Sequence, residues 1–217
     1  MRIPSLHTLL FLLLCALFIS CQREQTENYP DGKLKSVQQF KGKNQHGIST
    51  WYYENGKKQL EAEYKDGKLN GRSVRWYLNG QKESSETYTD GLKNGLILTW
   101  NSSGLKTEER TYRNDTLDGP YNLYHENGMV KIEGSYKTGM FDGPWNYFNE
   151  FGFKVGDASF RNGAGLQRAF HMNGKIWREV PYVGNRRNGI EKEFNQSGKL
   201  IKETTYLNDV AIKVSGN

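Results

Sequence analysis

Two series of glycines recur along this chain every 24 residues, and this period constrains the fold more than any other feature. The spacing shortens once, by two positions, between Gly143 and Gly165. A fixed period of roughly 20–50 residues is the signature of repeat architectures, in which each unit needs its neighbours for stability. The first series is Gly47, Gly71, Gly95, Gly119, Gly143, Gly165 and Gly189, and the second is Gly56, Gly80, Gly104, Gly128, Gly152, Gly174 and Gly198.

Aromatic and acidic residues keep the same register as the glycines. An aromatic residue stands five positions after each first-series glycine and eight positions after each second-series glycine, as with Tyr52 and Tyr64. An acid stands five positions after the second-series glycine in six of seven repeats, Ser85 being the exception. These acids are Glu61, Glu109, Glu133, Asp157, Glu179 and Glu203.

The Asn-Gly and Asp-Gly pairs at the recurring glycines predict β-hairpins. Asn-Gly and Asp-Gly pairs supply the positive φ angles that tight hairpin turns require, and no segment has the apolar period of a helix. We therefore expect an all-β fold, an elongated single-sheet antiparallel meander of about seven 24-residue β-hairpin repeats. Gly32 extends the second series backwards, so about fifteen strands should form a sheet roughly 70 Å long at ~4.8 Å per strand.

The hairpin register can also be predicted. A three-residue loop, 54–56, with a bulge at Gly56 would pair Thr50 with Leu60, and a slip of one residue would exchange the two faces. This register places the following residues on one face: Ile48, Tyr52, Leu60, Ala62 and Tyr64. The other face would then carry Ser49, Trp51, Tyr53 and the acid series.

The chain divides into four predicted segments. Residues 1–20 form a signal peptide, residues 21–31 a lipidated cysteine and linker, residues 32–206 the repeat array, and residues 207–217 a tail in which Val210 to Val214 add an edge strand. The shortened repeat contains "FRNGAG", Phe160 to Gly165, where the connection between two hairpins has lost two residues. We expect a local bend or an irregular turn there.

The repeat unit resembles the MORN repeat in its bacterial variant form. The segments "YKDGKLNGRSVRWYLNGQ" and "YKTGMFDGPWNYFNEFG" are close to the variant's pattern, with Asp115 and Asn185 standing where other repeats have glycine. The resemblance implies elongated antiparallel sheets with scaffolding and protein-interaction roles, and contacts with phospholipids. Some bacterial members, the YwqK-type group, are regarded as antitoxins, so an antitoxin-like partner-binding role is a further expectation.

The amino terminus is typical of an exported lipoprotein. The apolar run from Leu9 to Ile19 is too short for a bilayer-spanning helix of ~20 residues but fits the core of a secretory signal. The run ends "LFISC", which resembles a lipobox with lipidation at Cys21. An ordinary signal peptide, or a short anchor with an incidental cysteine, is the alternative. Lipidation predicts a place in the bacterial cell envelope and favours the outer membrane over the inner. It does not specify the leaflet of the membrane.

Composition limits the chemistry of the mature chain. Cys15 and Cys21 are the only cysteines, so cleavage and lipidation would leave no thiol for a disulfide, a zinc site or a nucleophile. Only 35% of the residues are hydrophobic, fewer than the roughly 45–50% of average proteins even allowing for glycine. The net charge of +6 comes from interspersed lysines and glutamates, which predicts a solvated mixed surface.

We expect no enzymatic activity, no metal and no cofactor. A catalytic carboxylate pair needs two different environments, whereas the acid series offers equivalent positions that lysines or turn N–H groups can pair with. His125 and His171 share a repeat position but would lie ~19 Å apart in a flat sheet, too far to share zinc.

Aromatic residues on the face opposite Tyr52 are the candidate functional residues. Such rings anchor protein partners or stack on sugars, although cross-strand packing in a thin sheet would also explain them. The candidates for partner binding are Trp51, Tyr53, Tyr77, Tyr121, Trp145 and Tyr147. The expected partners are the membrane, through the lipid, and a protein, with an envelope glycan or phospholipid as the alternative. Nucleic acid is not expected, because the basic residues form no stripe.

Overall fold

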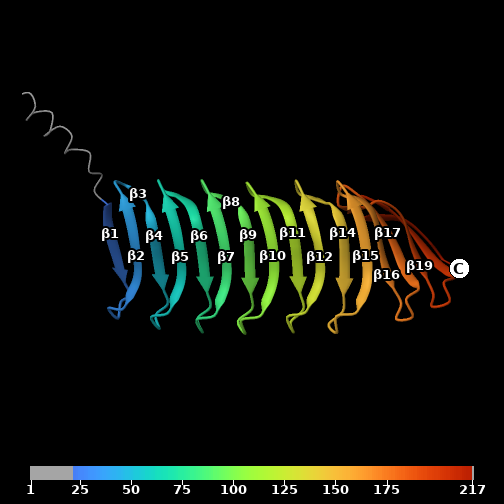
Figure 1. The fold of residues 1–217 in the computed structure, drawn as a ribbon, viewed down its shortest axis with the longest axis horizontal. Coiled ribbons are helices and arrows are strands. Elements are labelled where there is room, and N and C mark those ends of the chain that lie inside the picture. The colour runs from blue at the N-terminus through green and yellow to red at the C-terminus, as the bar shows by residue number, and fades with distance from the viewer. Residues whose placement is uncertain (1–21, 217) are drawn as a thin grey trace, which may run out of the picture.

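The computed structural model describes residues 22–216 and shows one open, antiparallel sheet of 21 strands (Figure 1). Consecutive strands lie side by side in chain order, so the all-β meander predicted from the repeats is confirmed. Within the described range no helix is long and apolar enough to cross a membrane. The predicted signal peptide and Cys21 lie outside the described residues.

The strands follow one another with short connections. They are β1 (Gln22–Asn28), β2 (Leu34–Lys41), β3 (Asn44–Gln45), β4 (Gly47–Tyr52), β5 (Lys58–Lys65), β6 (Lys68–Trp76), β7 (Lys82–Thr89), β8 (Leu92–Lys93), β9 (Gly95–Trp100), β10 (Lys106–Arg113), β11 (Thr116–Tyr124), β12 (Val130–Lys137), β13 (Met140–Phe141), β14 (Gly143–Phe148), β15 (Lys154–Arg161), β16 (Ala164–Phe170), β17 (Ile176–Val183), β18 (Arg186–Arg187), β19 (Gly189–Phe194), β20 (Leu200–Leu207) and β21 (Val210–Gly216).

Both ends of the sheet extend beyond the seven hairpins. The predicted edge strand near Val210 is present as β21, which pairs with β20. Residues 22–28, which we expected to be linker, form β1 and pair with β2 along their whole length. The segment "QREQTEN" has no apolar residue, so it is a strand because β2 offers it a hydrogen-bonding edge. Its charged residues suit an edge strand, since charges discourage further pairing.

The turn between the two strands of a hairpin is the one predicted. In the first repeat the N–H of Gly56 donates to the carbonyl of Tyr53, and the N–H of Tyr53 donates to the carbonyl of Lys57 (both 2.8 Å). Gly56 has φ of 81°, a conformation that favours glycine. The loop therefore spans residues 54–56, as expected.

The predicted register beyond this turn is wrong by one residue. Tyr52 pairs with Lys58, but Trp51 pairs with Leu60, because a second bulge at Gln59 inserts an extra residue into β5. Thr50 consequently faces Glu61 and not Leu60. The same shift occurs in the other hairpins, for example between Arg75 and Trp76.

The shift reassigns the two faces of the sheet. Ser49, Trp51, Leu60, Ala62 and Tyr64 now share one face, which we call the aromatic face; the rings of Trp51 and Tyr64 meet with centroids 6.4 Å apart.

The opposite, acidic face carries Thr50 and the acid series. Our placement of Trp51 with the acids, and of Ile48 and Tyr52 with Tyr64, was therefore wrong. Ile48 pairs with Glu63 and remains 51% exposed.

The connections between hairpins consist of a tight turn followed by a bulge. Lys65 pairs with Lys68 across Asp66 and Gly67, whose φ values are 50° and 84°, as a two-residue type I′ turn requires. Gly71 lies in the bulge that follows, with φ of 117°. A Cβ there would lie 1.9 Å from a carboxylate oxygen of Glu63.

The shortened repeat has the most regular connection, and the irregular turn predicted there is wrong. β15 and β16 pair in an unbroken register down to Arg161 and Ala164, around the two-residue turn 162–163. The two missing residues are those of the bulge, so the hairpin retains its turn and loses only its irregularity. In Figure 1 the strands after β15 tilt away from those before them.

The core of the sheet is a cluster of aromatic side chains on the aromatic face of the later repeats. Trp145, Ala158 and Phe160 are buried at its centre. The indole of Trp145 meets Phe141 and Tyr136 edge to face, with centroids 4.8 and 5.2 Å apart, and stacks on Tyr121 at 5.7 Å.

Candidate interaction surfaces

The acid series forms structural pairs on the acidic face. Four of its six members have partners there. Lys58 contacts Glu61, Lys106 donates to Glu109 at 2.5 Å, and Lys154 lies 3.3 Å from Asp157. Asn122 and Asn146 donate to Glu109 and Glu133, each at 2.9 Å. Arg168 adds a second cation on Asp157, at 2.9 Å.

The electrostatics at Glu109 favour its charged form. Burial acts to raise the pKa of this carboxyl group, but hydrogen bonds from Lys106 and Asn122 outweigh burial and lower the pKa below its ordinary value. The bond to Glu109 correspondingly raises the pKa of Lys106. Glu109 is thus held as a carboxylate in an ion pair.

Lysines of the acidic face also cover aromatic rings. The ammonium of Lys58 lies 5.7 Å from the ring centre of Trp76, that of Lys82 lies 6.0 Å from Trp100, and that of Lys106 lies 5.3 Å from Tyr124. Because two of these lysines, Lys58 and Lys106, serve acid and ring together, this face is a ladder of mutually satisfied groups.

Four of the six candidate aromatic residues lie on the aromatic face, but not as free rings. Trp145 is only 4% exposed and belongs to the buried core. Tyr121 and Tyr147 pack against that core, and burial raises the pKa of both phenols well above the usual value. Trp51 packs on Tyr64 at the other end of the face. The structure therefore gives these four rings packing roles.

The other two candidates, Tyr53 and Tyr77, lie in the turns and link neighbouring repeats. The hydroxyl of Tyr53 donates to the carbonyl of Trp76 at 2.7 Å, and that of Tyr77 donates to the carbonyl of Trp100 at 2.9 Å. We call this contact the ring bridge.

His125 and His171 occupy the same repeat position as Tyr53 and Tyr77. The Nε2 atom of each lies 2.9 Å from the carbonyl oxygen of Phe148 or Phe194, respectively. Among the described residues no group of three potential metal ligands comes together.

The residues that sequence reasoning missed are apolar side chains exposed at the turns between paired strands. Phe151 is 70% exposed, Phe153 is 68% exposed, and Met172 is fully exposed. Phe151 and Phe153 depart from the polar residues that stand at their positions in the first repeat, Asn55 and Lys57. This departure was the available signal, although it became meaningful only once the turns were located.

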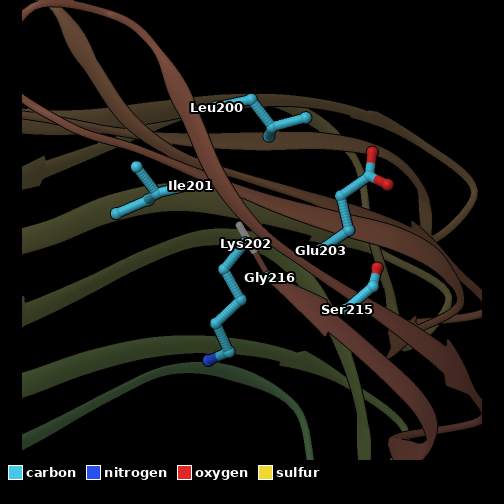
Figure 2. A pocket seen from close by; sticks show the side chains of 6 residues that line it. All are labelled: Leu200, Ile201, Lys202, Glu203, Ser215 and Gly216. Atoms are coloured by element: carbon cyan, nitrogen blue, oxygen red, sulfur yellow. The ribbon is translucent and has the colours of Figure 1, made fainter.

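A small groove lies at the end of the sheet between β20 and β21 (Figure 2). It measures about 80 Å³ and is lined by Leu200, Ile201, Lys202, Glu203, Ser215 and Gly216. Figure 2 shows Glu203 and Ser215 on one side and Lys202 pointing the other way, where its ammonium donates to Glu193 at 2.8 Å. The groove has room for only a very small group.

Comparison with known proteins matches the repeats, not the whole chain. Four segments match the family model described as MORN repeat variant: residues 24–41, 45–66, 117–138 and 187–208. Each segment covers most of one hairpin, and the first includes most of β1, which supports its place in the repeat series. No curated protein matches the chain. The fold and these matches define an open, single-sheet protein of β-hairpin repeats, four segments of which match the MORN repeat variant.

Proposed function

We propose that this protein is a non-enzymatic, membrane-anchored lipoprotein whose repeat sheet acts as a protein-interaction scaffold in the bacterial cell envelope. MORN repeats are commonly protein- or membrane-interaction modules, and the matched segments carry that expectation to this chain. The lipobox-like ending at Cys21 supports the anchor.

The observation that carries the proposal is a difference in side-chain contacts between residues that recur with the repeat and residues that depart from it. Carboxylates and aromatic rings that recur with the repeat are engaged in ion pairs, bridges and packing, as at Glu109 and Trp145. Among the apolar residues left in water, Phe151 and Phe153 are departures from the repeat, since they stand where the first repeat has Asn55 and Lys57. Exposed apolar side chains that gather in a patch are typical of interaction sites, and Phe151 and Phe153 lie in one turn, between β14 and β15.

Of the alternatives, a glycan-binding face loses its main support. That hypothesis used Trp51 and Trp145 as an exposed stacking surface, whereas Trp145 is buried beneath its neighbours. Phospholipid contact and an antitoxin-like role stay predictions from the family resemblance.

Anchoring is tested by cell fractionation. The wild-type chain should sediment with membranes, and Cys21→Ala should move it to the soluble fraction, because the acyl chains would be lost. A Cys15→Ala variant is the matched control and should remain with the membranes. Retention of the Cys21→Ala protein in the membrane fraction would contradict the lipid anchor.

The scaffold role is tested by crosslinking in intact cells with the tagged wild-type protein. We expect one or a few protein partners to be recovered reproducibly above the level seen with an untagged strain. Recovery of none above that background would overturn the scaffold proposal, whatever the outcome of the fractionation.

A further inference from the structure

Neighbouring turns at one edge of the sheet are joined by two recurring hydrogen bonds. The first is the ring bridge formed by Tyr53, Tyr77, His125 and His171. The second, which we call the amide bridge, comes from the asparagine before the second-series glycine. Its side chain donates to a backbone carbonyl of the next turn, as Asn127 does to Glu150 at 2.7 Å. The other amide bridges start at Asn55, Asn79 and Asn173.

Both bridges are missing between the β14–β15 turn and the β16–β17 turn. Asn149 replaces the ring, and its Oδ1 accepts from the N–H groups of Phe151 and Phe153 within its own turn, each at 3.0 Å. Phe151 replaces the amide and has no group to donate. Within the described residues, neither side chain therefore hydrogen-bonds to the β16–β17 turn.

A third contact between turns is also lost at this place. In the two preceding turns an apolar side chain extends to the glycine of the next turn. Leu105 lies 3.5 Å from the position that a Cβ on Gly128 would take, and Met129 lies 2.7 Å from that of a Cβ on Gly152. Phe153 occupies the equivalent position, but nothing lies within 4 Å of such a Cβ on Gly174. The two turns are therefore separated by open space.

The space is a cavity of about 500 Å³ with an apolar lining. Most of its wall is provided by Phe153, Val155, Phe170 and Met172. Lys154 is the only Lys, Arg, Asp or Glu among the described residues that line it. Phe151 and Met172 are exposed beside it. An apolar hollow bordered by exposed aromatic and methionine side chains has the composition of a protein-binding hot spot.

We propose that the cleft between the β14–β15 and β16–β17 turns takes an aromatic or large aliphatic side chain of a protein partner, on a segment with an acidic residue beside it. This inference rests on the proposed scaffold function and names its contact site. The acid follows from charge complementarity: Lys154 lines the cleft and shares Asp157 with Arg168, so two cations face a single carboxylate beside it. A hollow between two turns suits an inserted anchor better than the flat surface of a bilayer.

The chain provides variants that should keep the fold. Phe151→Asn together with Phe153→Lys restores the residues that the first repeat has at Asn55 and Lys57. Leu105→Lys changes the same position in the β9–β10 turn. In that turn Asn101 and Ser103 stand at the two bridge positions, and the Oδ1 of Asn101 accepts from N–H groups of its own turn, as that of Asn149 does. Leu105→Lys is therefore a matched control.

The experiment selects random twelve-residue peptides on phage against the immobilised full chain. We expect enriched peptides to carry an aromatic or large aliphatic residue next to Asp or Glu. They should bind wild-type and Leu105→Lys protein equally and bind the Phe151→Asn/Phe153→Lys protein at least tenfold more weakly. Failure to enrich such peptides, or equal binding to all three proteins, would overturn the proposal.

A parallel arm uses vesicles of phosphatidylglycerol and phosphatidylcholine. We expect sedimentation with the vesicles to be the same for wild-type and double-variant proteins. Sedimentation that depends on Phe151 and Phe153, without peptide binding, would overturn the proposal in favour of a lipid surface. Crosslinked partners that persist with the double variant would place the contact elsewhere, which overturns this inference and leaves the scaffold function intact.

Discussion

At the scale of single residues, the aromatic face is built from pairs matched in size across neighbouring strands. Tyr121 pairs with Gly134, Trp145 with Ala158, and Tyr147 with Gly156. Each large ring therefore lies opposite a residue with little or no side chain. A single sheet has no second layer to cover it, so its own rings must lie flat over small neighbours to exclude water.

Gly134 is the clearest case, because a Cβ there would lie 2.2 Å from the indole of Trp145. Replacing it by valine should displace the ring and lower the free energy of unfolding by ~1–3 kcal/mol, as overpacking typically does. Urea denaturation measures the change. Gly216→Ala is the control, since its Cβ would meet only the carbonyl oxygen of Ile201, at 3.4 Å. Equal stability of Gly134→Val and wild type would show that Trp145 does not pack as described.

The partly buried tyrosines around the core predict a loss of stability at high pH. Burial raises the pKa of Tyr121, Tyr136 and Tyr147 above the ordinary value of about 10. A raised folded-state pKa gives stability that is full below the unfolded pKa and is lost as pH rises toward the folded pKa. We expect these phenols to ionise only as the sheet unfolds. A pH titration that records tyrosinate absorbance and circular dichroism together measures both events. Ionisation of every tyrosine at the ordinary pKa in a folded sheet would contradict this.

At the scale of elements, the departures from the repeat in the connections between hairpins have a structural role. From the turn 66–67 onward, a backbone N–H in each tight turn donates to a carbonyl of the preceding repeat, as from Gly139 to Leu117 at 2.8 Å. Where the second turn residue is Asp or Asn, its side chain adds another bond. Asp115 accepts from the N–H of Lys93 at 2.7 Å, and Asp209 accepts from that of Arg187 at 2.9 Å.

Asn185 extends this contact across the shortened hairpin. Its Oδ1 accepts from the N–H of Phe141 at 2.8 Å, and its Nδ2 donates to the carbonyl of Gly139 at 2.9 Å. The side chain thus reaches two repeats back, because β16 lacks the two-residue strand that would otherwise lie between. Asn185 thereby compensates for the missing bulge residues.

Replacing Asn185 by glycine tests this role without straining the backbone, since its φ of 64° suits glycine. Loss of two hydrogen bonds should cost ~1–3 kcal/mol of unfolding free energy. Asn185→Asp, which keeps the acceptor but not the donor, should fall between the two in thermal or urea denaturation. Wild-type stability in the glycine variant would mean that the connection across the hairpin contributes nothing.

The sequence was sufficient to predict turns and repeat boundaries but not the register. The turns could be predicted because their positive φ angles favour Asn-Gly and Asp-Gly pairs. The bulge at Gln59 could not be predicted, because the same repeat position holds Glu83, Lys131 and Trp177 in other repeats. A residue that protrudes from a bulge has no fixed partner, so its type is free to vary. The cleft beside Phe153 escaped prediction because it depends on three absent contacts.

At the scale of the whole molecule, the protein is a one-dimensional array. Four two-residue strands share a row with the strand that follows them, so the 21 strands form 17 rows. At ~4.8 Å per row the sheet is about 75 Å long. Such an array exposes nearly every repeat to solvent on two faces and two edges. That geometry suits a scaffold, because several partners can bind along it without competing for one pocket.

The most direct test of this account is the radius of gyration in solution, measured by small-angle X-ray scattering on residues 22–216 at several concentrations. A slab about 75 Å long predicts a radius of gyration of about 24 Å. A compact globule of the same chain length would give about 16 Å. A concentration-independent value close to that of the slab supports the extended sheet of hairpin repeats, and a value close to that of the globule would contradict it.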